Sequence, residues 1–148
     1  QRQMCIRDRI ERFMNCIPED WGEGYDHVTI CCTCENQDRA DYRLPIFLQM
    51  PMKHREIIHE PMLEPVEIRP YLASGLIEKV ICGGESGPDA RLCDFAWILN
   101  TINQCVEYEV PFYFKQTGAR FKKGRNIYRI ERKNQMAQAA KAGVNYRC

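Results

Sequence analysis

The sequence has no long hydrophobic run. No stretch approaches the roughly 20 apolar residues that a membrane-spanning helix needs, and the N-terminus lacks the apolar segment of a secretory signal. With 148 residues, of which 45% are hydrophobic and 28% charged, the chain has the composition of one globular domain. These features predict a cytoplasmic protein with no membrane partner.

Common phosphate-binding and catalytic motifs are also absent. There is no G-x-G-x-x-G, and no G-K-[ST] follows Gly83 and Gly84, so neither a dinucleotide fingerprint nor a P-loop is present. With only three histidines, no Ser–His–Asp arrangement can be proposed. The catalytic residues are therefore unknown from the sequence.

Cysteine is abundant, but the spacings that bind metals are missing. The nine cysteines are Cys5, Cys16, Cys31, Cys32, Cys34, Cys82, Cys93, Cys105 and Cys148. Without a secretory signal, we interpret them as reduced thiols. Cys31, Cys32 and Cys34 lie in an apolar segment rather than in C-x₂-C pairs on turns, which favours buried structural thiols over a zinc site. Ligation by His54 and His59 is the less favoured alternative, and we predict no metal site.

Charge is divided unevenly along the chain. Residues 1–114 carry 11 Lys/Arg and 19 Asp/Glu, for a net charge of −8, whereas residues 115–148 carry 10 Lys/Arg and one acid, for a net charge of +9. The basic segment also contains aromatic residues, including Phe121 and Tyr128, a mixture that can bind single-stranded nucleic acid. A cofactor phosphate and the chain's own acidic face are the alternative partners.

The first nine residues, QRQMCIRDR, resemble a translated sequencing-adapter remnant of the kind found in assembled metagenomic genes. We therefore interpret residues 1–9 as a non-native leader and exclude them from the fold. A genuine helix start is the alternative. The leader would make the remaining chain part of a longer protein.

Hydrophobic periodicity predicts strands that alternate with helices. The predicted strands are residues 27–34, 55–59, 79–82 and 111–114, and the predicted helices are residues 10–16, 38–50, 94–108 and 133–142, with a hairpin at 123–125. Continuously apolar strands in this order are typical of a parallel sheet with crossover helices on both faces. Because a complete (β/α)₈ barrel needs about 250 residues, we predict an α/β half-barrel of about four βα units at residues 10–118 and a basic extension at residues 119–148.

Each predicted strand ends in polar or glycine residues. In parallel α/β folds, ligands bind at these C-terminal ends, and glycines let the backbone approach a ligand closely. Singly, these residues are also typical of helix caps and surface charges; together they predict a functional rim. The rim residues are Glu35, Asn36, Glu60, Gly83, Gly84, Glu85, Ser86, Lys115 and Gln116.

Four segments together resemble the C-terminal half of a phage and bacterial family, domain of unknown function 5131. They are EDWGEGYDHVTICCTCENQDRADYRLPIFLQMP, EIIHEPMLEPVEIRPYL, KVICGGESGPDARLCDFAWI and VPFYFKQTGARF. The resemblance extends over residues 10–147. The runs CENQ, HEPMLEPV, GGESGPDAR and FKQTG give it most of its specificity.

Full-length members of that family resemble radical S-adenosylmethionine enzymes with an N-terminal three-cysteine motif for a [4Fe–4S] cluster. The resemblance implies that Gly83, Gly84, Glu85 and Ser86 contact S-adenosylmethionine or substrate. It places Glu35, Asn36, Glu60, Lys115 and Gln116 on the substrate side. The three-cysteine motif would lie upstream of this chain, so the resemblance implies S-adenosylmethionine and the cluster for the full-length parent and no cofactor for this chain.

Three hypotheses follow from the sequence. The first, which we favour, is an inactive C-terminal part of a radical S-adenosylmethionine-like enzyme acting on an unknown small molecule or nucleic acid. The second is a nucleic-acid-binding module that acts through the basic C-terminal segment. The third is a structural fragment whose open sheet edges pair with a second copy.

Overall fold

The computed structural model describes residues 2–7 and 9–147, in which helices and strands alternate. The strands are β1 (Arg2–Ile6), β2 (Val28–Thr33), β3 (His54–His59), β4 (Lys79–Gly83), β5 (Leu92–Asp94), β6 (Phe112–Gln116), β7 (Arg120–Lys123) and β8 (Asn126–Arg129). The helices are the 3₁₀ helix η1 (Ile10–Asn15), α1 (Gln37–Gln49), α2 (Arg69–Leu72), α3 (Phe95–Glu107) and α4 (Arg132–Lys141). None of the helices in the described part of the chain is long and apolar enough to cross a membrane.

A five-stranded parallel sheet forms the body of the molecule, with the strand order β1-β2-β3-β4-β6. The four predicted strands are confirmed as β2, β3, β4 and β6. Neighbours in the sequence are also neighbours in the sheet, because each pair is joined by a crossover that contains a helix. The α/β class and the parallel sheet are confirmed, whereas closure into part of a barrel stays a prediction.

Strand β1 lies within the nine residues that the sequence analysis excludes from the fold. Arg2–Ile6 pair in parallel with β2, so that Cys5 lies opposite Cys31, and the Arg2 amide also donates to the His27 carbonyl (2.8 Å). The sheet therefore has one strand more than predicted. The non-native origin of residues 1–9 stays a prediction, and residues 1 and 8 lie outside the described part.

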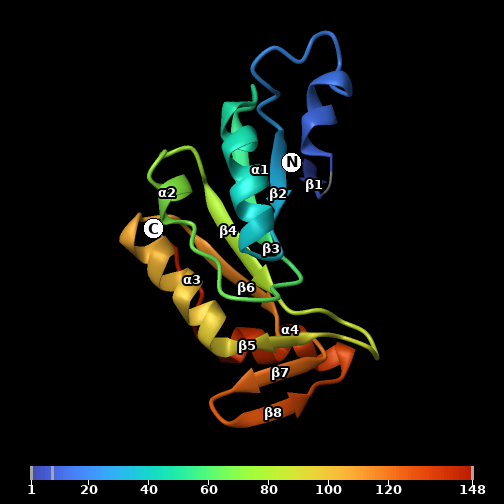
Figure 1. The fold of residues 1–148 in the computed structure, drawn as a ribbon, viewed down its shortest axis with the longest axis vertical. Helices are drawn as coiled ribbons and strands as arrows, with labels where there is room; N and C mark the ends of the chain where they lie inside the picture. The colour runs from blue at the N-terminus through green and yellow to red at the C-terminus, as the bar shows by residue number, and fades with distance from the viewer. Residues whose placement is uncertain (1, 8, 148) are drawn as a thin grey trace.

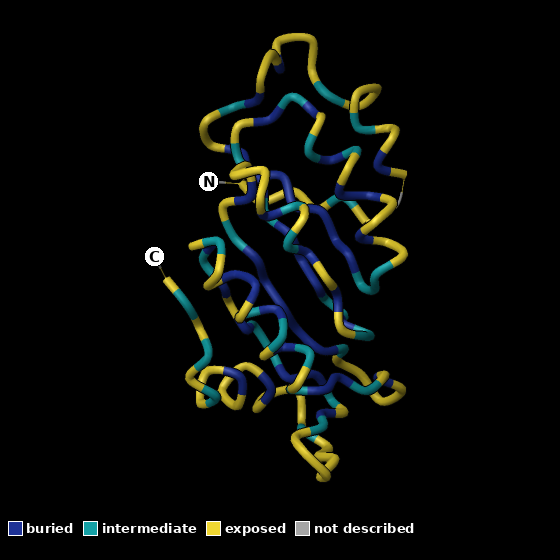
Figure 2. The backbone as a smooth tube through the Cα atoms, turned by 60° about the vertical axis from the view of Figure 1, so that its left-hand side comes forward, coloured by how far each residue is buried: buried dark blue, intermediate teal, exposed yellow. Residues whose placement is uncertain are grey.

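Helices α1, α2 and α3 all cover the same face of this sheet (Figure 1). The main core lies between them, where side chains such as Ile57 and Val80 from the strands meet Leu44, Phe47 and Ile98 from the helices, all of them buried. The central strands are the most buried part of the backbone (Figure 2). The prediction that crossover helices cover both faces is wrong for the described residues, because successive right-handed crossovers in sequential strand order return to one side.

The buried face of α3 does not follow side-chain hydrophobicity alone. Asp94 is the N-cap, and its side chain accepts a hydrogen bond from the Ala96 amide (2.9 Å). Val106, however, is 46% exposed, whereas Gln104 is fully buried. Gln104 is buried because its amide group bonds both the Ile68 N–H (2.7 Å) and the Val66 carbonyl (2.9 Å), which satisfies its polar atoms.

The basic C-terminal segment folds against the body. Strands β7 and β8 form the predicted hairpin, which joins β5 in a second, three-stranded sheet, and α4 confirms the predicted helix. Helix α4 packs beside β6, and the Thr117 amide bonds the Gln135 carbonyl (3.3 Å). Tyr146 forms a bridge with Phe112 at the outer edge of β6, so one of the two sheet edges is partly paired within the chain.

Candidate functional site

The sheet face opposite α1–α3 carries alternating charged and apolar rows of side chains. The strand register places Cys31, Glu56 and Lys79 side by side, and Ile58 beside Ile81 one row further toward the C-terminal ends. Cys31, Ile58 and Ile81 form a small hydrophobic cluster of their own. We name this surface the polar sheet face, because charged rows lie on both sides of the apolar cluster.

The first charged row is centred on Glu56. Its carboxylate accepts a hydrogen bond from Gln3 Nε2 (2.5 Å) and lies 3.8 Å from Lys79 Nζ, and the Cys31 thiol donates to it over 3.6 Å. Lys79 Nζ lies 5.9 Å from the centre of the Tyr113 ring. These contacts hold an acid and a base in place in a half-buried position, where solvent screening is weaker than at an open surface.

The second charged row contains two of the predicted rim residues. Lys115 Nζ, at the end of β6, lies 2.8 Å from Glu60 Oε2, just after β3. The Glu60 side chain is only 19% exposed, whereas that of Lys115 is 44% exposed. The structure thus brings together two residues that are 55 positions apart in the sequence, as the strand-end argument predicts.

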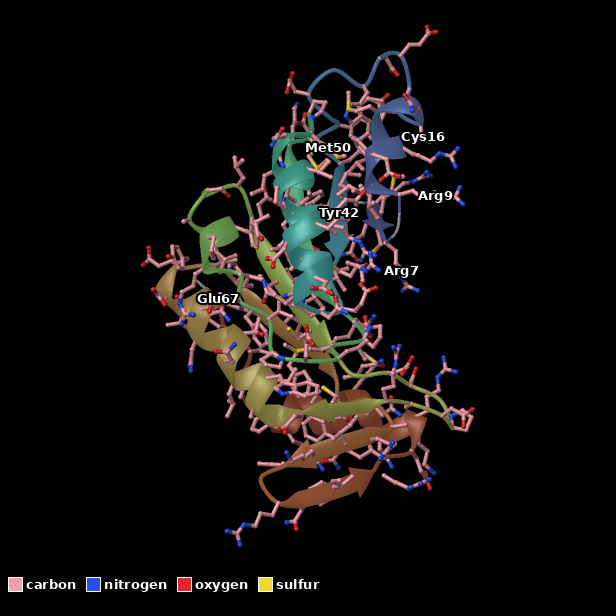
Figure 3. All side chains as sticks on the ribbon, viewed as in Figure 1. Arg7, Arg9, Cys16, Tyr42, Met50 and Glu67 are labelled. Atoms are coloured by element: carbon pink, nitrogen blue, oxygen red, sulfur yellow. The ribbon has the colours of Figure 1, made fainter. Side chains whose placement is uncertain are left out.

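A cavity of about 470 Å³ opens on the polar sheet face. Its walls are formed by Gln3, Cys5, Arg7, Thr33, Ile58, Glu60, Lys79, Ile81, Tyr113, Lys115 and Met136. Two of the lining cations are ion-paired, Lys115 with Glu60 and Lys79 with Glu56. Arg7, which extends from the segment after β1 (Figure 3), has no ion-pair partner among the described residues and adds a positive charge to the wall. This volume is in the range of ligand sites, and the charge balance favours a ligand that carries an anionic group.

Gly83 and Gly84 pack against the chain itself. A Cβ atom on Gly84 would lie 2.2 Å from the Thr117 carbonyl oxygen, and the Gly84 amide bonds the Gln116 carbonyl (3.0 Å). The Gln116 side chain in turn donates to the Gly84 carbonyl (2.9 Å). In this structure the glycines let two strand-end loops approach each other. Their contact with a cofactor stays a prediction.

Glu85 and Ser86 follow β4 and lie outside the cavity lining of the polar sheet face. The Glu85 carboxylate binds the Arg91 guanidinium through two contacts of 2.9 Å, and these hydrogen bonds lower the pKa of Glu85 to about 2. Ser86 is exposed. Neither residue lines the cavity, so their role as ligand contacts also stays a prediction.

Glu35 and Asn36 act locally at the start of α1. Glu35 pairs with the buried Arg43 (2.7 Å), which also donates to the Thr33 carbonyl (2.5 Å). Asn36 caps the helix by accepting from the Arg39 amide (3.0 Å). These contacts stabilise the loop after β2 and leave neither side chain lining the cavity.

The buried cysteines lie in the core as free thiols. The described residues contain no group of three or more His, Cys, Asp or Glu side chains placed to hold a metal ion. Cys32 and Cys34 lie on the helix side, with their Sγ atoms 3.8 Å apart, and Cys31 lies on the other face. Burial raises the pKa of Cys93 to about 12 and that of Cys82 well above its usual range, so these thiols are poor sources of thiolate.

Several residues of the site were not predicted from the sequence. Glu56, Lys79 and Tyr113 lie inside strands, where apolar residues dominate, and Gln3 and Arg7 lie in the excluded leader. One sequence signal could have found the strand residues. Side chains an even number of residues apart share a face of a strand, and Glu56 lies four residues before Glu60 and Tyr113 two residues before Lys115. The positions of the strand ends alone did not identify these residues.

The chain is similar to a known protein family over almost its whole length. A model of the family described as "Protein of unknown function (DUF5131)" matches residues 2–146, which includes β1. No curated protein and no solved structure matches the chain.

Proposed function

The chain belongs to the DUF5131 family, and from this premise we propose that it is the C-terminal part of an S-adenosylmethionine-dependent iron–sulfur enzyme. In this proposal the polar sheet face lines the cavity that receives substrate or cofactor. The parallel strands in sequential order support it, because βα barrels bind their ligands at the C-terminal ends of such strands.

The Glu60–Lys115 pair beside the cavity is the observation on which the proposal most depends. A buried or half-buried charged side chain on a sheet face costs free energy of desolvation unless it is paired or binds a ligand. Lys115, Lys79 and Arg7 supply positive charge around the cavity. They fit a ligand with a carboxylate or phosphate, and the amino-acid end of S-adenosylmethionine carries a carboxylate.

An iron–sulfur cluster does not fit the described residues of this chain. Its cysteines would have to ligate iron as thiolates, whereas Cys31, Cys34, Cys82 and Cys93 are buried with raised pKa values. The proposal therefore requires the cluster ligands to come from sequence outside this chain. In the proposal, the role of this chain is to bind and orient a ligand through the polar sheet face.

The test uses the complete product of the source gene, obtained by a long read upstream of codon 1. It is prepared anaerobically with iron and sulfide and assayed for 5′-deoxyadenosine release from S-adenosylmethionine. We expect release by the complete protein, none by the 148-residue chain, a loss of about tenfold or more for Lys115→Met, and no change for Lys133→Met on α4. A gene without an upstream three-cysteine motif, or a complete protein that releases no 5′-deoxyadenosine, would overturn the proposal.

A nucleic-acid-binding role is the second candidate. Some cations of the basic C-terminal segment are paired within the chain, and the unpaired ones favour this role. Lys115 and Lys122 pair with Glu60 and Asp94 of the acidic body, as the self-pairing alternative predicts. Several other basic residues are exposed and have no ion-pair partner among residues 2–7 and 9–147. They are Arg120, Lys123, Arg125, Arg129, Arg132, Lys141 and Arg147. These cations are available to an anionic partner.

A further inference from the structure

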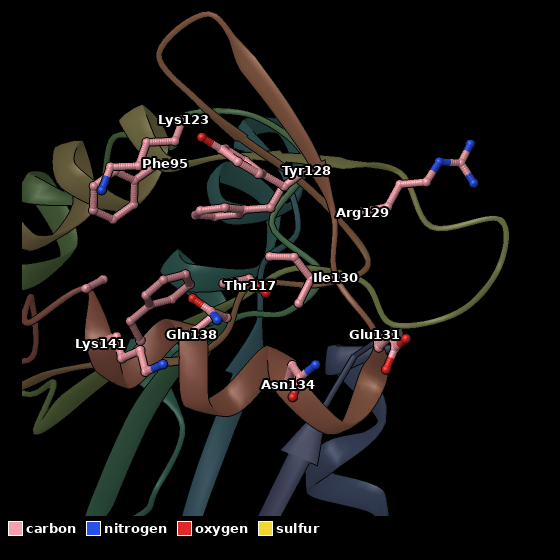
Figure 4. Close-up of a pocket in the computed structure, with 13 residues that line it drawn as sticks. Phe95, Thr117, Lys123, Tyr128, Arg129, Ile130, Glu131, Asn134, Gln138 and Lys141 are labelled. Carbon is pink, nitrogen blue, oxygen red and sulfur yellow. The ribbon is translucent and has the colours of Figure 1, made fainter.

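A second cavity lies between α4 and the β7–β8 hairpin, away from the polar sheet face (Figure 4). Its volume is about 690 Å³, within the range of small-molecule sites. We name it the hairpin pocket. Its walls are formed by Phe95, Phe114, Thr117, Phe121, Lys123, Tyr128, Arg129, Ile130, Glu131, Asn134, Gln138, Lys141 and Ala142.

Aromatic rings make up much of the pocket's apolar wall. Phe95, Phe114 and Phe121 pack on one another, with ring centres 5.9 to 6.4 Å apart. Tyr128, on β8, lines the same pocket and remains 45% exposed. A ring with an open face can stack on a planar ligand at small entropic cost.

The opposite wall is a polar stripe of α4. Asn134, Gln138 and Lys141 are spaced by four and three residues, so they share one face of the helix. Figure 4 shows all three side chains on the side of α4 that faces the hairpin. An amide group both donates and accepts hydrogen bonds, which is the requirement for recognising the edge of a heteroaromatic ring.

Positive charge gathers at one side of the pocket. Lys123 Nζ lies 5.1 Å from the centre of the Phe95 ring, and in Figure 4 Lys141 lies on the same side as Phe95. Glu131 is the one acidic residue of the wall, and it pairs with Lys133 outside the pocket (3.0 Å). The two lysines are therefore placed to meet a phosphate or another anionic group.

We propose that the hairpin pocket binds a nucleotide. The base stacks on Tyr128 and bonds the amides of Asn134 and Gln138, and the phosphate lies at Lys123 and Lys141. The shared chemistry is a planar heteroaromatic ring joined to a phosphate. It can come from a free nucleotide or from one residue of a single-stranded nucleic acid, and the experiment separates the two sources.

The experiment measures binding by the full 148-residue chain at low salt. The probes are 2-aminopurine ribonucleoside monophosphate, whose fluorescence is quenched on stacking, and a labelled oligodeoxythymidylate of about ten nucleotides. Saturable quenching by the free nucleotide assigns the pocket to a small ligand. Binding of the oligonucleotide alone, with no response to the free nucleotide, assigns it to single-stranded nucleic acid.

Matched variants separate the pocket from general surface effects. Gln138→Ala and Lys141→Gln remove pocket groups, whereas Asn103→Ala on α3 and Lys133→Gln on α4 shorten or neutralise exposed side chains that line neither cavity. We expect the first pair to weaken binding about tenfold and the second pair to leave it within about twofold.

The stacking ring is tested by a graded pair of variants at one position. Tyr128→Phe should retain stacking and leave binding within about twofold, because it keeps the ring and removes only the hydroxyl group. Tyr128→Ala should weaken binding about tenfold, because it removes the ring.

Two results would overturn the proposal. One is the absence of binding by both probes. The other is an equal loss for the pocket variants and their matched controls, which would assign the binding to diffuse charge. Circular dichroism of each variant shows whether α4 is intact.

Discussion

His59 donates a hydrogen bond from Nδ1 to the backbone carbonyl of Cys34 over 2.5 Å, and the His59 side chain is fully buried. The carbonyl can only accept, so the proton of the neutral ring is on Nδ1. Nε2 has no hydrogen-bond partner among the described residues. This bond joins the end of β3 to the residue after β2, close to the strand ends that form the candidate site.

The first prediction concerns the acid stability that follows from this burial. Burial lowers the pKa of His59 from 6.5 to about 4, against the raising effect of the Cys34 carbonyl. The unfolded chain therefore binds the proton first. The stability that the neutral ring contributes is fully present above pH 6.5 and is lost as the pH falls toward 4. At pH 5 the loss amounts to about 2 kcal/mol of unfolding free energy. Urea unfolding at pH 7 and pH 5 should show this extra loss in the native protein and not in His59→Gln.

The second prediction compares the two adjacent glycines at the end of β4. Gly84→Ala should cost about 3 kcal/mol of unfolding free energy, because its Cβ would meet backbone atoms of Thr117 and Gly118 at 2.2 to 2.9 Å. Gly83→Ala should cost only about 1 kcal/mol, since its Cβ would meet the Glu60 and Gln116 side chains at 3.1 and 3.3 Å, and side chains can shift. Equal losses in thermal or urea unfolding would contradict this view of the loop contact.

The third prediction concerns the buried arginine behind Glu35. Arg43→Met should lower stability by about 2–3 kcal/mol, because it leaves the Thr33 carbonyl and a 24%-exposed carboxylate without their donor. Glu35→Gln keeps an oxygen acceptor for Arg43 and should cost less than about 1 kcal/mol. Both costs are measured by urea unfolding. If Glu35→Gln proves as damaging as Arg43→Met, the negative charge rather than the hydrogen bond holds this loop.

The fourth prediction concerns thiol reactivity. Cys5 and Cys16 are exposed, whereas the other six described cysteines are buried. Because Cys148 lies outside the described residues, the test uses Cys148→Ser. A disulfide reagent at pH 8 should label the two exposed thiols in the folded protein and the remaining six only in denaturant. Rapid labelling of a third thiol in the folded state would show that the core opens on the time scale of the assay.

Local pattern was sufficient to predict most of the secondary structure. Short β-branched runs such as the one around Ile30 form buried strands wherever they pair, so β2, β3, β4 and β6 were predictable. The N-cap at Asp94 and the hairpin turn at Gly124 depend on local backbone geometry. The strand-end rule also brought Glu60 and Lys115 together, because parallel strands end at one edge of a sheet.

Tertiary contacts decided what the local pattern could not. Gln104 is buried and Val106 exposed on α3 because the loop before α2 supplies partners for an amide. Gly84 permits a close backbone contact with Thr117. Thr117 is distant in the sequence, and the two residues are neighbours only because β4 pairs with β6.

The sequence by itself therefore determined the order and type of the elements, since these depend on periodicity and turn chemistry. Only the tertiary structure decided which face of the sheet the crossover helices leave uncovered and which charges meet there. It also decided that α4 and the β7–β8 hairpin enclose a pocket. Such features depend on how distant segments pack, and burial and pairing, not local propensity, set their energy.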